Sequence, residues 1–420
     1  MALLTKRRFL PLFITQFFGA FNDNLFKNAL VILLTFQAAH WTTLKPGQIT
    51  NLAAGIFILP FFLFSATCGQ LADKYDKARL ARISKVLEIA IALFATAGLY
   101  LESLAMLMTA LFLLGLQSTL FGPVKYAILP QHLRDNELVP GNALVEAATF
   151  VAILLGTLAG GILAASKGGP AWISLAIFVI AVIGYAASRF IPTAAAPEPG
   201  LRLNFNPVSE TWRCLGYARE NSKVFLAVIG ISWFWLYGSA LLAQFPDFTR
   251  SVLGGKESLA TLLLTVFAVG IGGGSILCGR LSREKPDLRL TLIGAIGLSV
   301  FGLDLAWTAS GAAPALGQPL TVLLTEWRIW RVLLALLAIG ISGGLYGVPL
   351  YAQMQRDSEP NKRARVVAAN NVLNALFMVI AALSALALLH LGASIAIIFL
   401  IVALGNTAMI FIGWRMVKRM

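Results

Sequence analysis

The fold is decided around residues 69–79, which read Gly69-Gln70-Leu71-Ala72-Asp73-Lys74-Tyr75-Asp76-Lys77-Ala78-Arg79. This charged stretch lies between two long apolar runs, at 49–72 and 79–101. A helix needs about 20 predominantly apolar residues to cross the hydrocarbon core of a bilayer. Each run is long enough for that, so residues 69–79 are predicted to form the turn between two membrane-spanning helices.

The same alternation of apolar runs and short polar breaks continues in both directions along the chain. The runs fall at 9–39, 49–72, 79–101, 104–130, 138–165, 170–192, 223–248, 257–281, 288–309, 328–353, 365–389 and 393–414. They are too long and too continuously apolar for the strands of a membrane barrel, which alternate with period two. The sequence therefore predicts an all-α membrane protein with twelve transmembrane helices.

Composition excludes most other classes of protein. Of the 420 residues, 58% are hydrophobic and 12% are charged, whereas soluble domains have about 45–50% apolar and about 25% charged residues. Too few charged residues are present to cover a water-facing surface, which excludes a soluble enzyme. The three cysteines match neither a metal site nor a disulfide framework, and no Walker-type phosphate-binding motif occurs. We expect no metal, no cofactor and no catalytic residue.

The distribution of basic residues predicts the orientation. The two termini and every second break between runs carry 24 Lys and Arg residues, while the alternate breaks carry four. Cytoplasmic loops of membrane proteins are enriched in Lys and Arg, so both termini are predicted to be cytoplasmic. This asymmetry also explains the net charge of +14 without a nucleic-acid partner.

A long polar stretch at 193–222 divides the runs into six and six. Its composition predicts a cytoplasmic linker between an N-terminal six-helix bundle, 1–192, and a C-terminal six-helix bundle, 223–420. The halves also repeat short motifs: Gly122-Pro123-Val124-Lys125-Tyr126-Ala127 corresponds to Gly347-Val348-Pro349-Leu350-Tyr351-Ala352. Parallel repeats of this kind place a substrate site between the two halves.

Part of the linker is predicted to form an amphipathic helix on the inner membrane face. Asn206 before Pro207 is typical of an N-cap followed by the first helical residue. Val208, Trp212 and Leu215 recur at helical spacing, opposite Glu210 and other charged residues. We expect these three apolar side chains to share one face of the helix.

The first apolar run contains the densest polar sequence inside a predicted span. Asn22, Asp23, Asn24 and Lys27 lie within it, and a charge at mid-bilayer costs about 2.5–3.5 kcal/mol on the insertion scale. Asp23 and Lys27 are four residues apart and can pair on one helix face. Two interpretations remain open: a polar clamp between helices, or the wall of a cavity that binds a polar headgroup.

Other spans also carry ionisable residues. Lys85 and Glu88 are spaced for an i,i+3 ion pair, which is predicted to be structural. Lys125 follows Gly122-Pro123, and Glu146 lies about two turns into the fifth span. Lys125 and Glu146 could meet each other or Asp23, and the sequence does not decide between these options.

Residues 69–79 resemble the signature loop of the major facilitator superfamily, with Asp76 in place of the usual glycine and one basic position displaced. The resemblance implies a major facilitator fold with two six-helix halves. It also implies a gating role for Gly69, Asp73, Lys77 and Arg79, with Asp73 latching the cytoplasmic side. An exposed ion pair contributes under about 1 kcal/mol, which suits a gate that must open.

Three segments carry a closer resemblance: Gln16-Phe17-Phe18-Gly19-Ala20-Phe21-Asn22-Asp23-Asn24, Phe121-Gly122-Pro123-Val124-Lys125-Tyr126-Ala127-Ile128-Leu129-Pro130 and Gly141-Asn142-Ala143-Leu144-Val145-Glu146-Ala147-Ala148-Thr149. The chain resembles the bacterial lysophospholipid transporter family. In particular it is similar to the transporter module fused in some bacteria to an acyltransferase and an acyl-carrier-protein synthetase. The close resemblance covers residues 9–165.

This resemblance implies a flippase that moves lysophosphatidylethanolamine-type lipids inward across the bacterial inner membrane by alternating access. A separate cytoplasmic acyltransferase or acyl-ACP synthetase would then re-acylate them in phospholipid remodelling. The predicted substrate-binding residues are Asn22, Asp23, Asn24, Lys27, Lys125, Tyr126, Asn142 and Glu146. By charge matching, Lys27 and Lys125 suit the lipid phosphate, while Asp23 and Glu146 suit the amine.

Two other functions compete with lysophospholipid transport. A proton-coupled exporter of amphipathic drugs would use Asp23 or Glu146 as the proton carrier. The fifth span, however, has Gly156 and Gly160-Gly161 without the Gly-Pro that this class carries near its run of glycines. A membrane-embedded acyltransferase or a non-transporting scaffold would show reaction or binding without flux. Twelve helices in one chain can form a complete path, so we expect a monomer.

Overall fold

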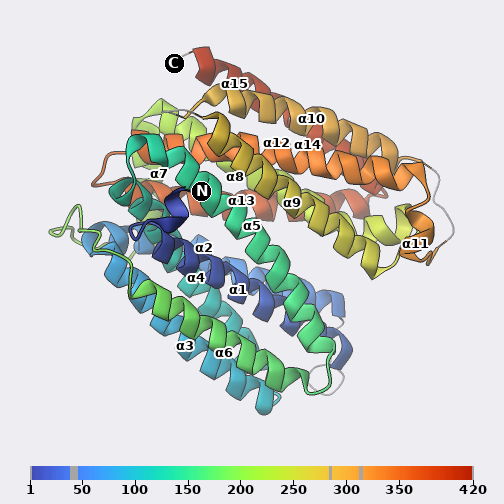
Figure 1. Ribbon diagram of the computed structural model, residues 1–420, viewed down its shortest axis with the longest axis horizontal. Coiled ribbons are helices and arrows are strands. Elements are labelled where there is room, and N and C mark those ends of the chain that lie inside the picture. Colours follow the sequence, from blue (N-terminus) through green and yellow to red (C-terminus); the bar gives the residue numbers. More distant parts are fainter. Residues whose placement is uncertain (1, 38–45, 283–285, 312–315, 419–420) are drawn as a thin grey trace. The chain divides into compact units, whose positions relative to one another are not determined.

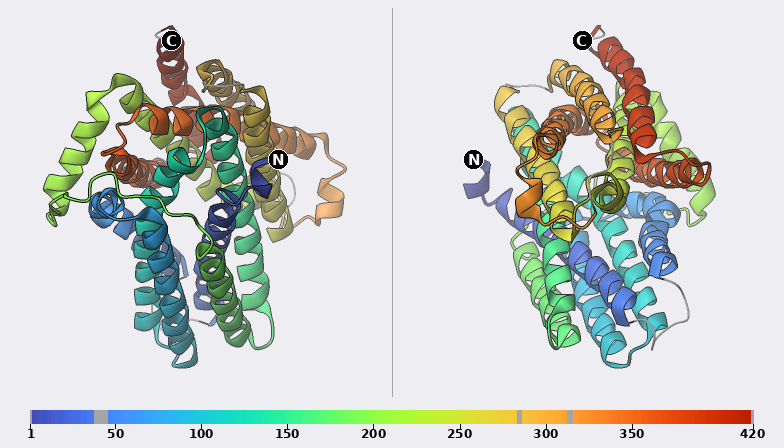
Figure 2. Two further views of the ribbon diagram at one scale, coloured as in Figure 1. Left: turned by 60° about the vertical axis from the view of Figure 1, so that its left-hand side comes forward. Right: turned by 90° about the vertical axis from the view of Figure 1, so that its right-hand side faces the viewer.

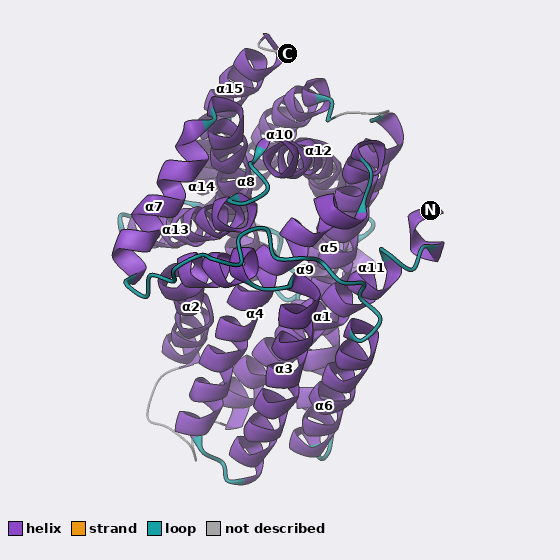
Figure 3. Cartoon of the chain, turned by 90° about the vertical axis from the view of Figure 1, so that its left-hand side faces the viewer, coloured by secondary structure: helices purple, strands orange, loops and turns teal. Residues whose placement is uncertain are grey.

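The computed structural model describes residues 2–37, 46–282, 286–311 and 316–418. Within these residues the chain is helical throughout, with loops between the helices and a single isolated bridge between Gly255 and Gln318 (Figure 3). The all-α prediction is confirmed. The last two residues of the first predicted run, 38 and 39, lie outside the described residues.

The elements of the first half begin with a 3₁₀ turn, η1, and end with the linker helix. They are η1 (Ala2–Thr5), α1 (Leu10–Gln37), α2 (Pro46–Lys74), α3 (Lys77–Tyr100), α4 (Leu104–His132), α5 (Asp135–Ala165), α6 (Gly169–Ser188) and α7 (Pro207–Glu220). Residues 189–206 form an extended loop between α6 and α7 (Figure 2).

The elements of the second half include a short π-helical turn, η3, and a helix that is interrupted near the C-terminus. They are α8 (Ser222–Asp247), η3 (Phe248–Val252), α9 (Glu257–Leu281), α10 (Leu288–Ala309), α11 (Leu320–Leu323), α12 (Trp327–Asp357), α13 (Arg363–His390), α14 (Ile395–Gly405) and α15 (Thr407–Lys418). The predicted last span is therefore made of α14 and α15, which together are long and apolar enough to cross a membrane.

Eleven candidate membrane spans occur within the described residues. The first of the twelve predicted spans, α1, is not among them, because the polar residues at 22–28 lower its hydropathy. Its 28 residues nevertheless exceed the length that a span requires.

The chain forms two compact units. Unit 1 contains Met1–Gly141, Val151–Asn221 and Gln355–Val372; unit 2 contains Asn142–Phe150, Ser222–Met354 and Leu373–Met420. Unit 1 therefore includes the start of α13 in addition to most of the first half.

Unit 1 is built around α1, α3, α4 and α6, with α3 and α6 running side by side (Figure 1). Most members of its core cluster are aliphatic side chains from these helices, such as Leu33, Ala95, Leu111 and Ile177. On α5, a Cβ at Gly160 would lie 2.4 Å from the carbonyl oxygen of Leu25 on α1. Small residues let helix backbones approach this closely.

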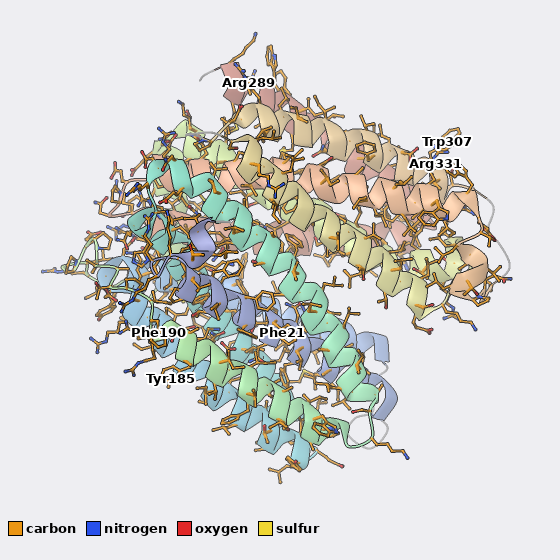
Figure 4. All side chains as sticks on the ribbon, in the orientation of Figure 1. Phe21, Tyr185, Phe190, Arg289, Trp307 and Arg331 are labelled. Carbon is orange, nitrogen blue, oxygen red and sulfur yellow. The ribbon has the colours of Figure 1, made fainter. Side chains whose placement is uncertain are left out.

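In unit 2, glycines likewise let the backbones of α9 and α12 approach closely. A Cβ at Gly270 would lie 2.6 Å from the carbonyl oxygen of Leu337, and one at Gly344 would lie 2.3 Å from the amide nitrogen of Ser275. Asp304 on α10 pairs with Arg331 on α12 at 2.5 Å; Figure 4 labels Arg331 beside Trp307, near the ends of these helices.

The linker helix α7 begins where predicted and packs on the protein through Glu210, Cys214 and Ala218. The side chain of Asn206 accepts hydrogen bonds from the backbone N–H groups of Val208 and Ser209, which caps the helix. Glu210 is fully buried, whereas Val208 and Trp212 are exposed and Leu215 packs partly against the protein. Val208 and Trp212 thus share an uncovered apolar face, as predicted, while the small side chains at 214 and 218 let the helix backbone approach the protein on the other face.

Candidate substrate site

We call the polar residues at 22–28 of α1 the polar turn. Short-range hydrogen bonds organise it. Asn24 Nδ2 donates to the carbonyl oxygen of Ala20 at 2.8 Å, and Lys27 Nζ donates to Asn24 Oδ1 at 3.1 Å. The same ammonium group lies 5.3 Å from the centre of the Phe57 ring on α2. The expected Asp23–Lys27 ion pair is not formed between these two described residues, because Lys27 turns toward Asn24 instead.

Behind this turn lies a buried hydrogen-bond network centred on Glu88 of α3. Asn22 Nδ2 donates to Glu88 Oε1 at 2.9 Å, and Lys85 Nζ donates to Glu88 Oε2 at 2.5 Å. Gln117 Nε2 on α4 donates to Glu88 Oε2 at 3.2 Å and to Ser84 Oγ at 2.8 Å. We call Asn22, Ser84, Lys85, Glu88 and Gln117 the Glu88 network.

The Glu88 network is enclosed by residues that leave room for Lys85. A Cβ at Gly19 on α1 would lie 2.5 Å from Lys85 Nζ, and one at Gly184 on α6 would lie 3.4 Å from Lys85 Cδ. The Lys85 ammonium also lies 5.3 Å from the centre of the Phe121 ring. The side chains of Lys85 and Glu88 are 0% and 1% exposed, so the predicted ion pair is confirmed.

Two side-chain oxygen atoms of the polar turn accept no hydrogen bond from the described residues. Ser118 Oγ on α4 donates to Asp23 Oδ2 at 2.5 Å. Asp23 Oδ1 and Asn22 Oδ1 are buried and have no hydrogen-bond partner in the described part of the chain. Buried acceptors without a donor are rare and costly. Asp23 lies one helical turn before Lys27, so the turn suits a ligand that carries both a donor and an anionic group.

The remaining predicted substrate residues belong to two different units. In unit 1, Lys125 Nζ lies 4.7 Å from the centre of the Tyr126 ring, and that ring is buried. Asn142 and Glu146 on α5 belong to unit 2 and are both buried. That Lys125 and Glu146 share a site with Asp23 stays a prediction.

The predicted gating residues lie where α2 ends beside the start of α13, within unit 1. Asp73 accepts from Arg365 Nε at 3.0 Å and from the backbone N–H groups of Ala364 at 3.2 Å and Arg365 at 3.3 Å. Arg365 also donates to the Glu198 carboxylate of the linker. We call Asp73, Arg365 and Glu198 the clasp.

The clasp is buried rather than exposed. The Asp73 and Arg365 side chains are 0% and 3% exposed, so the expectation of a weak surface ion pair is wrong. A Cβ at Gly69 would lie 2.6 Å from Ala368 Cβ and 3.0 Å from the carbonyl oxygen of Ala364. Gly69 therefore permits the close approach of α2 and α13 that shields the pair from water.

The two basic gating residues have different positions. The Lys77 side chain is buried, and its Nζ has no hydrogen-bond partner among the described residues. Arg79 is exposed, and its backbone N–H donates to Asp76 Oδ1 at 2.8 Å. Asp76 is the N-cap of α3 and also accepts from the Ala194 backbone at 2.8 Å. These two hydrogen bonds give Asp76 a structural role at the position where the superfamily's signature loop has glycine.

Sequence reasoning missed five residues of this site: Arg365, Glu198, Gln117, Ser84 and Ser118. Arg365 lies in the basic stretch 362–365, which was counted only as a topology signal. Its partner Asp73 is 292 positions away, and no periodicity links two such positions. Gln117 lies in a continuous apolar run. Its amide, an isolated polar group in that run, was the one sequence signal that could have indicated a buried network.

Comparisons with known proteins agree with this architecture. A family model described as the Major Facilitator Superfamily matches residues 12–382. The lysophospholipid transporter LplT of Salmonella typhi is 28% identical over 356 residues, which cover 82% of this chain and 79% of that protein. LplT of Yersinia pestis (strain Pestoides F) is 28% identical over 361 residues, which cover 84% and 79% of the two chains.

Solved structures support the fold over nearly the whole chain. The human organic anion transporter MFSD10 (TETRAN) matches with a TM-score of 0.75 at 13% identity, covering 97% of this chain and 99% of that one. The E. coli fucose:proton symporter FucP matches with a TM-score of 0.69 at 13% identity, covering 97% and 98%. At this identity the likeness concerns the fold alone.

Proposed function

Because this chain belongs to the Major Facilitator Superfamily, we propose that it carries lysophosphatidylethanolamine-type lipids inward across the bacterial inner membrane. Membership makes the chain a membrane transporter and not an enzyme. The named relatives that it resembles over four-fifths of its length are lysophospholipid transporters. Transport proceeds by alternating access, and a separate cytoplasmic acyltransferase or acyl-ACP synthetase re-acylates the product.

The observation that carries this proposal is the unused acceptor pair on α1. Asp23 Oδ1 and Asn22 Oδ1 are buried without donors among the described residues, and a lipid ammonium group supplies donors. Lys27 lies one turn further along the same helix and is a cation for the phosphate. A zwitterionic headgroup supplies donors for the acceptors and an anion for Lys27, whereas an uncharged amphipath leaves the Lys27 ammonium without a counter-charge.

The orientation rests on the distribution of basic residues. The clasp and α7 lie at the end of unit 1 that carries the Lys- and Arg-rich breaks, such as 70–82 and 354–365. Under the positive-inside rule this end faces the cytoplasm, as do both termini. The clasp is then a gate on the cytoplasmic side, where the lipid would be released.

Replacing Asp23 by asparagine is expected to reduce lysophosphatidylethanolamine uptake about 10- to 100-fold. A hydrogen bond to a charged group contributes about 1.5–3 kcal/mol, and each 1.4 kcal/mol is about tenfold in affinity. Uptake is measured with radiolabelled lipid in proteoliposomes. Asp247→Asn, which changes an exposed aspartate at the end of α8, is the matched control and keeps the wild-type rate.

The same vesicles separate lysophospholipid transport from drug export. We expect Lys125→Met to lower uptake as well, and lysolipid flux to persist without an imposed pH gradient. Wild-type rates in both Asp23→Asn and Lys125→Met would remove these residues from the site. Flux of amphipathic dyes that follows a pH gradient, with no lysolipid flux, would contradict the proposed function and favour the proton-coupled exporter.

A further inference from the structure

The linker helix α7 is attached to unit 1 by a narrow face of small and buried side chains. Glu210, Cys214 and Ala218 lie along that face and are fully buried. Cys214 packs with Ala66 of α2 and Ala369 of α13. Burial raises the pKa of the Glu210 carboxyl, which accepts from Asn204 at 3.3 Å. This face fixes the helix firmly to the end of unit 1 that contains the clasp.

The opposite face of α7 is apolar and uncovered. Phe205, Val208 and Trp212 are 72%, 65% and 63% exposed. Phe205 lies just before the helix, and the spacing of three and four residues places all three side chains on the same side of its first two turns. Side chains on spanning helices have similar exposure, for example Ile162 at 69%. α7, however, has 14 residues and a mixed composition, so it does not span a membrane.

Basic residues surround the uncovered face. Arg202 precedes it, Arg213 follows Trp212, and Arg219 lies two turns beyond Trp212, all of them exposed. The Arg213 guanidinium lies 3.9 Å from Glu210 while its side chain remains 55% exposed. Exposed Lys and Arg near an anionic leaflet contribute about 1 kcal/mol each, and tryptophan is enriched at the membrane interface. The chemistry of this face therefore fits an anionic lipid surface.

The chain also brings α7 to the membrane by connectivity. α7 ends at Glu220, and the spanning helix α8 begins at Ser222. A helix that ends two residues before a span lies at the depth of the lipid headgroups. An apolar face with flanking arginines at that depth has a bilayer, rather than water, as its neighbour.

We propose that Phe205, Val208 and Trp212 insert into the cytoplasmic leaflet and that α7 senses anionic phospholipids there. The helix is placed to transmit this contact to the gate. Arg365 of the clasp lies 4.9 Å from the centre of the Tyr217 ring, and Lys362 lies 5.1 Å from it. Lys362 Nζ also pairs with Glu220 at 2.8 Å. One helix therefore contacts the membrane on one face and the start of α13 on the other.

Lipid binding to α7 stabilises the state in which these contacts are made. A ligand shifts an equilibrium by its difference in affinity for the two states. The clasp is made while α7 lies on unit 1, so a leaflet that holds α7 in place favours the closed clasp. Anionic lipid then sets how often the gate opens, whichever substrate the transporter carries.

Membrane contact is tested by a fluorescent probe on α7. Val208→Cys is labelled with an environment-sensitive nitrobenzoxadiazole dye, in a background with the three native cysteines, all buried, changed to alanine. Gly200→Cys is the control, because a Cβ at this exposed loop position has no neighbour within 4 Å. In phosphatidylcholine vesicles containing phosphatidylglycerol we expect a blue-shifted emission at position 208 and an unshifted one at 200.

The outcomes of the probe experiment are distinct. An unshifted emission at 208 in both lipid mixtures would overturn insertion. A blue shift of equal size in phosphatidylcholine alone would overturn the assignment to anionic lipid. Neither result depends on which substrate is transported, so failure here is separable from failure of the proposed function.

Coupling to the gate is tested by transport. Wild-type uptake is expected to change with the phosphatidylglycerol content of the vesicles, and the Phe205→Ser/Val208→Ser/Trp212→Ser variant is expected to lose that dependence. Its thermal unfolding temperature stays at the wild-type value, because the three side chains face away from the protein. Trp172→Ser, which changes an exposed tryptophan on α6, is the matched control and keeps the lipid dependence. A triple variant that retains the wild-type lipid dependence would contradict the coupling.

Discussion

Replacing Glu88 by glutamine is expected to lower the stability of the protein by about 3–5 kcal/mol, because a buried ion pair that loses one partner leaves an uncompensated charge. That charge is the Lys85 ammonium, which is 0% exposed. Asn22 and Gln117 would also lose an ionised acceptor. Thermal unfolding in detergent measures the loss, and lysolipid uptake is expected to fall with it because Asn22 positions the polar turn of α1.

A double-mutant cycle separates the ion pair from general disruption. Lys85→Met combined with Glu88→Gln removes both charges, and replacing a buried pair by neutral side chains is far less costly than breaking it. The double variant is therefore expected to be more stable than Glu88→Gln alone. Glu102→Gln, at an exposed glutamate, serves as the control and is expected to change stability little. Equal destabilisation by the single and double variants would contradict the coupling of Lys85 to Glu88.

Replacing Arg365 by glutamine is expected to open the clasp. The buried Asp73 carboxylate would keep its two backbone donors but lose its charged partner, at a cost of about 3–5 kcal/mol to the closed arrangement. Ala368→Cys reports this opening, because Ala368 is fully buried and a Cβ at Gly69 would lie 2.6 Å from it. In a cysteine-free background, a maleimide is expected to label position 368 faster when Arg365 is changed.

Glu359→Gln provides a control at the same place in the sequence. Glu359 is 61% exposed and pairs with Lys362. Such a pair contributes about 0–1 kcal/mol, so labelling at 368 is expected to stay close to the wild-type rate. Labelling that is equally fast with Arg365→Gln and Glu359→Gln would show that the buried pair with Asp73 does not hold the gate.

Much of the fold could be predicted because single helices in lipid satisfy their backbones locally. Each span is then visible as an apolar run, and Asn206-Pro207 is sufficient to place the start of α7. The face on which α7 packs could not be predicted in this way. Val208, Trp212 and Leu215 follow helical spacing, but this rule does not distinguish a protein core from a lipid surface, and both accept apolar side chains.

Only the part of the site whose residues are close together in the sequence could be predicted. The polar turn of α1 stands out because its residues are adjacent and lie in an apolar run. The partners that fix it come from other helices: Glu88 is 66 positions from Asn22, and Ser118 is 95 positions from Asp23. The strength of the clasp was underestimated for a related reason. The loop signature shows the charges, but burial of Asp73 depends on the glycine-mediated contact of α2 with α13.

The central claim, that the polar turn of α1 receives the headgroup of a lysophospholipid, is tested most directly by photocrosslinking. Lysophosphatidylethanolamine with a diazirine on its headgroup is added to the reconstituted protein, and labelled peptides are mapped by mass spectrometry. We predict labelling within residues 20–28, suppressed by excess unlabelled lysophosphatidylethanolamine. Competable labelling that lies elsewhere and leaves residues 20–28 unmodified would contradict the claim.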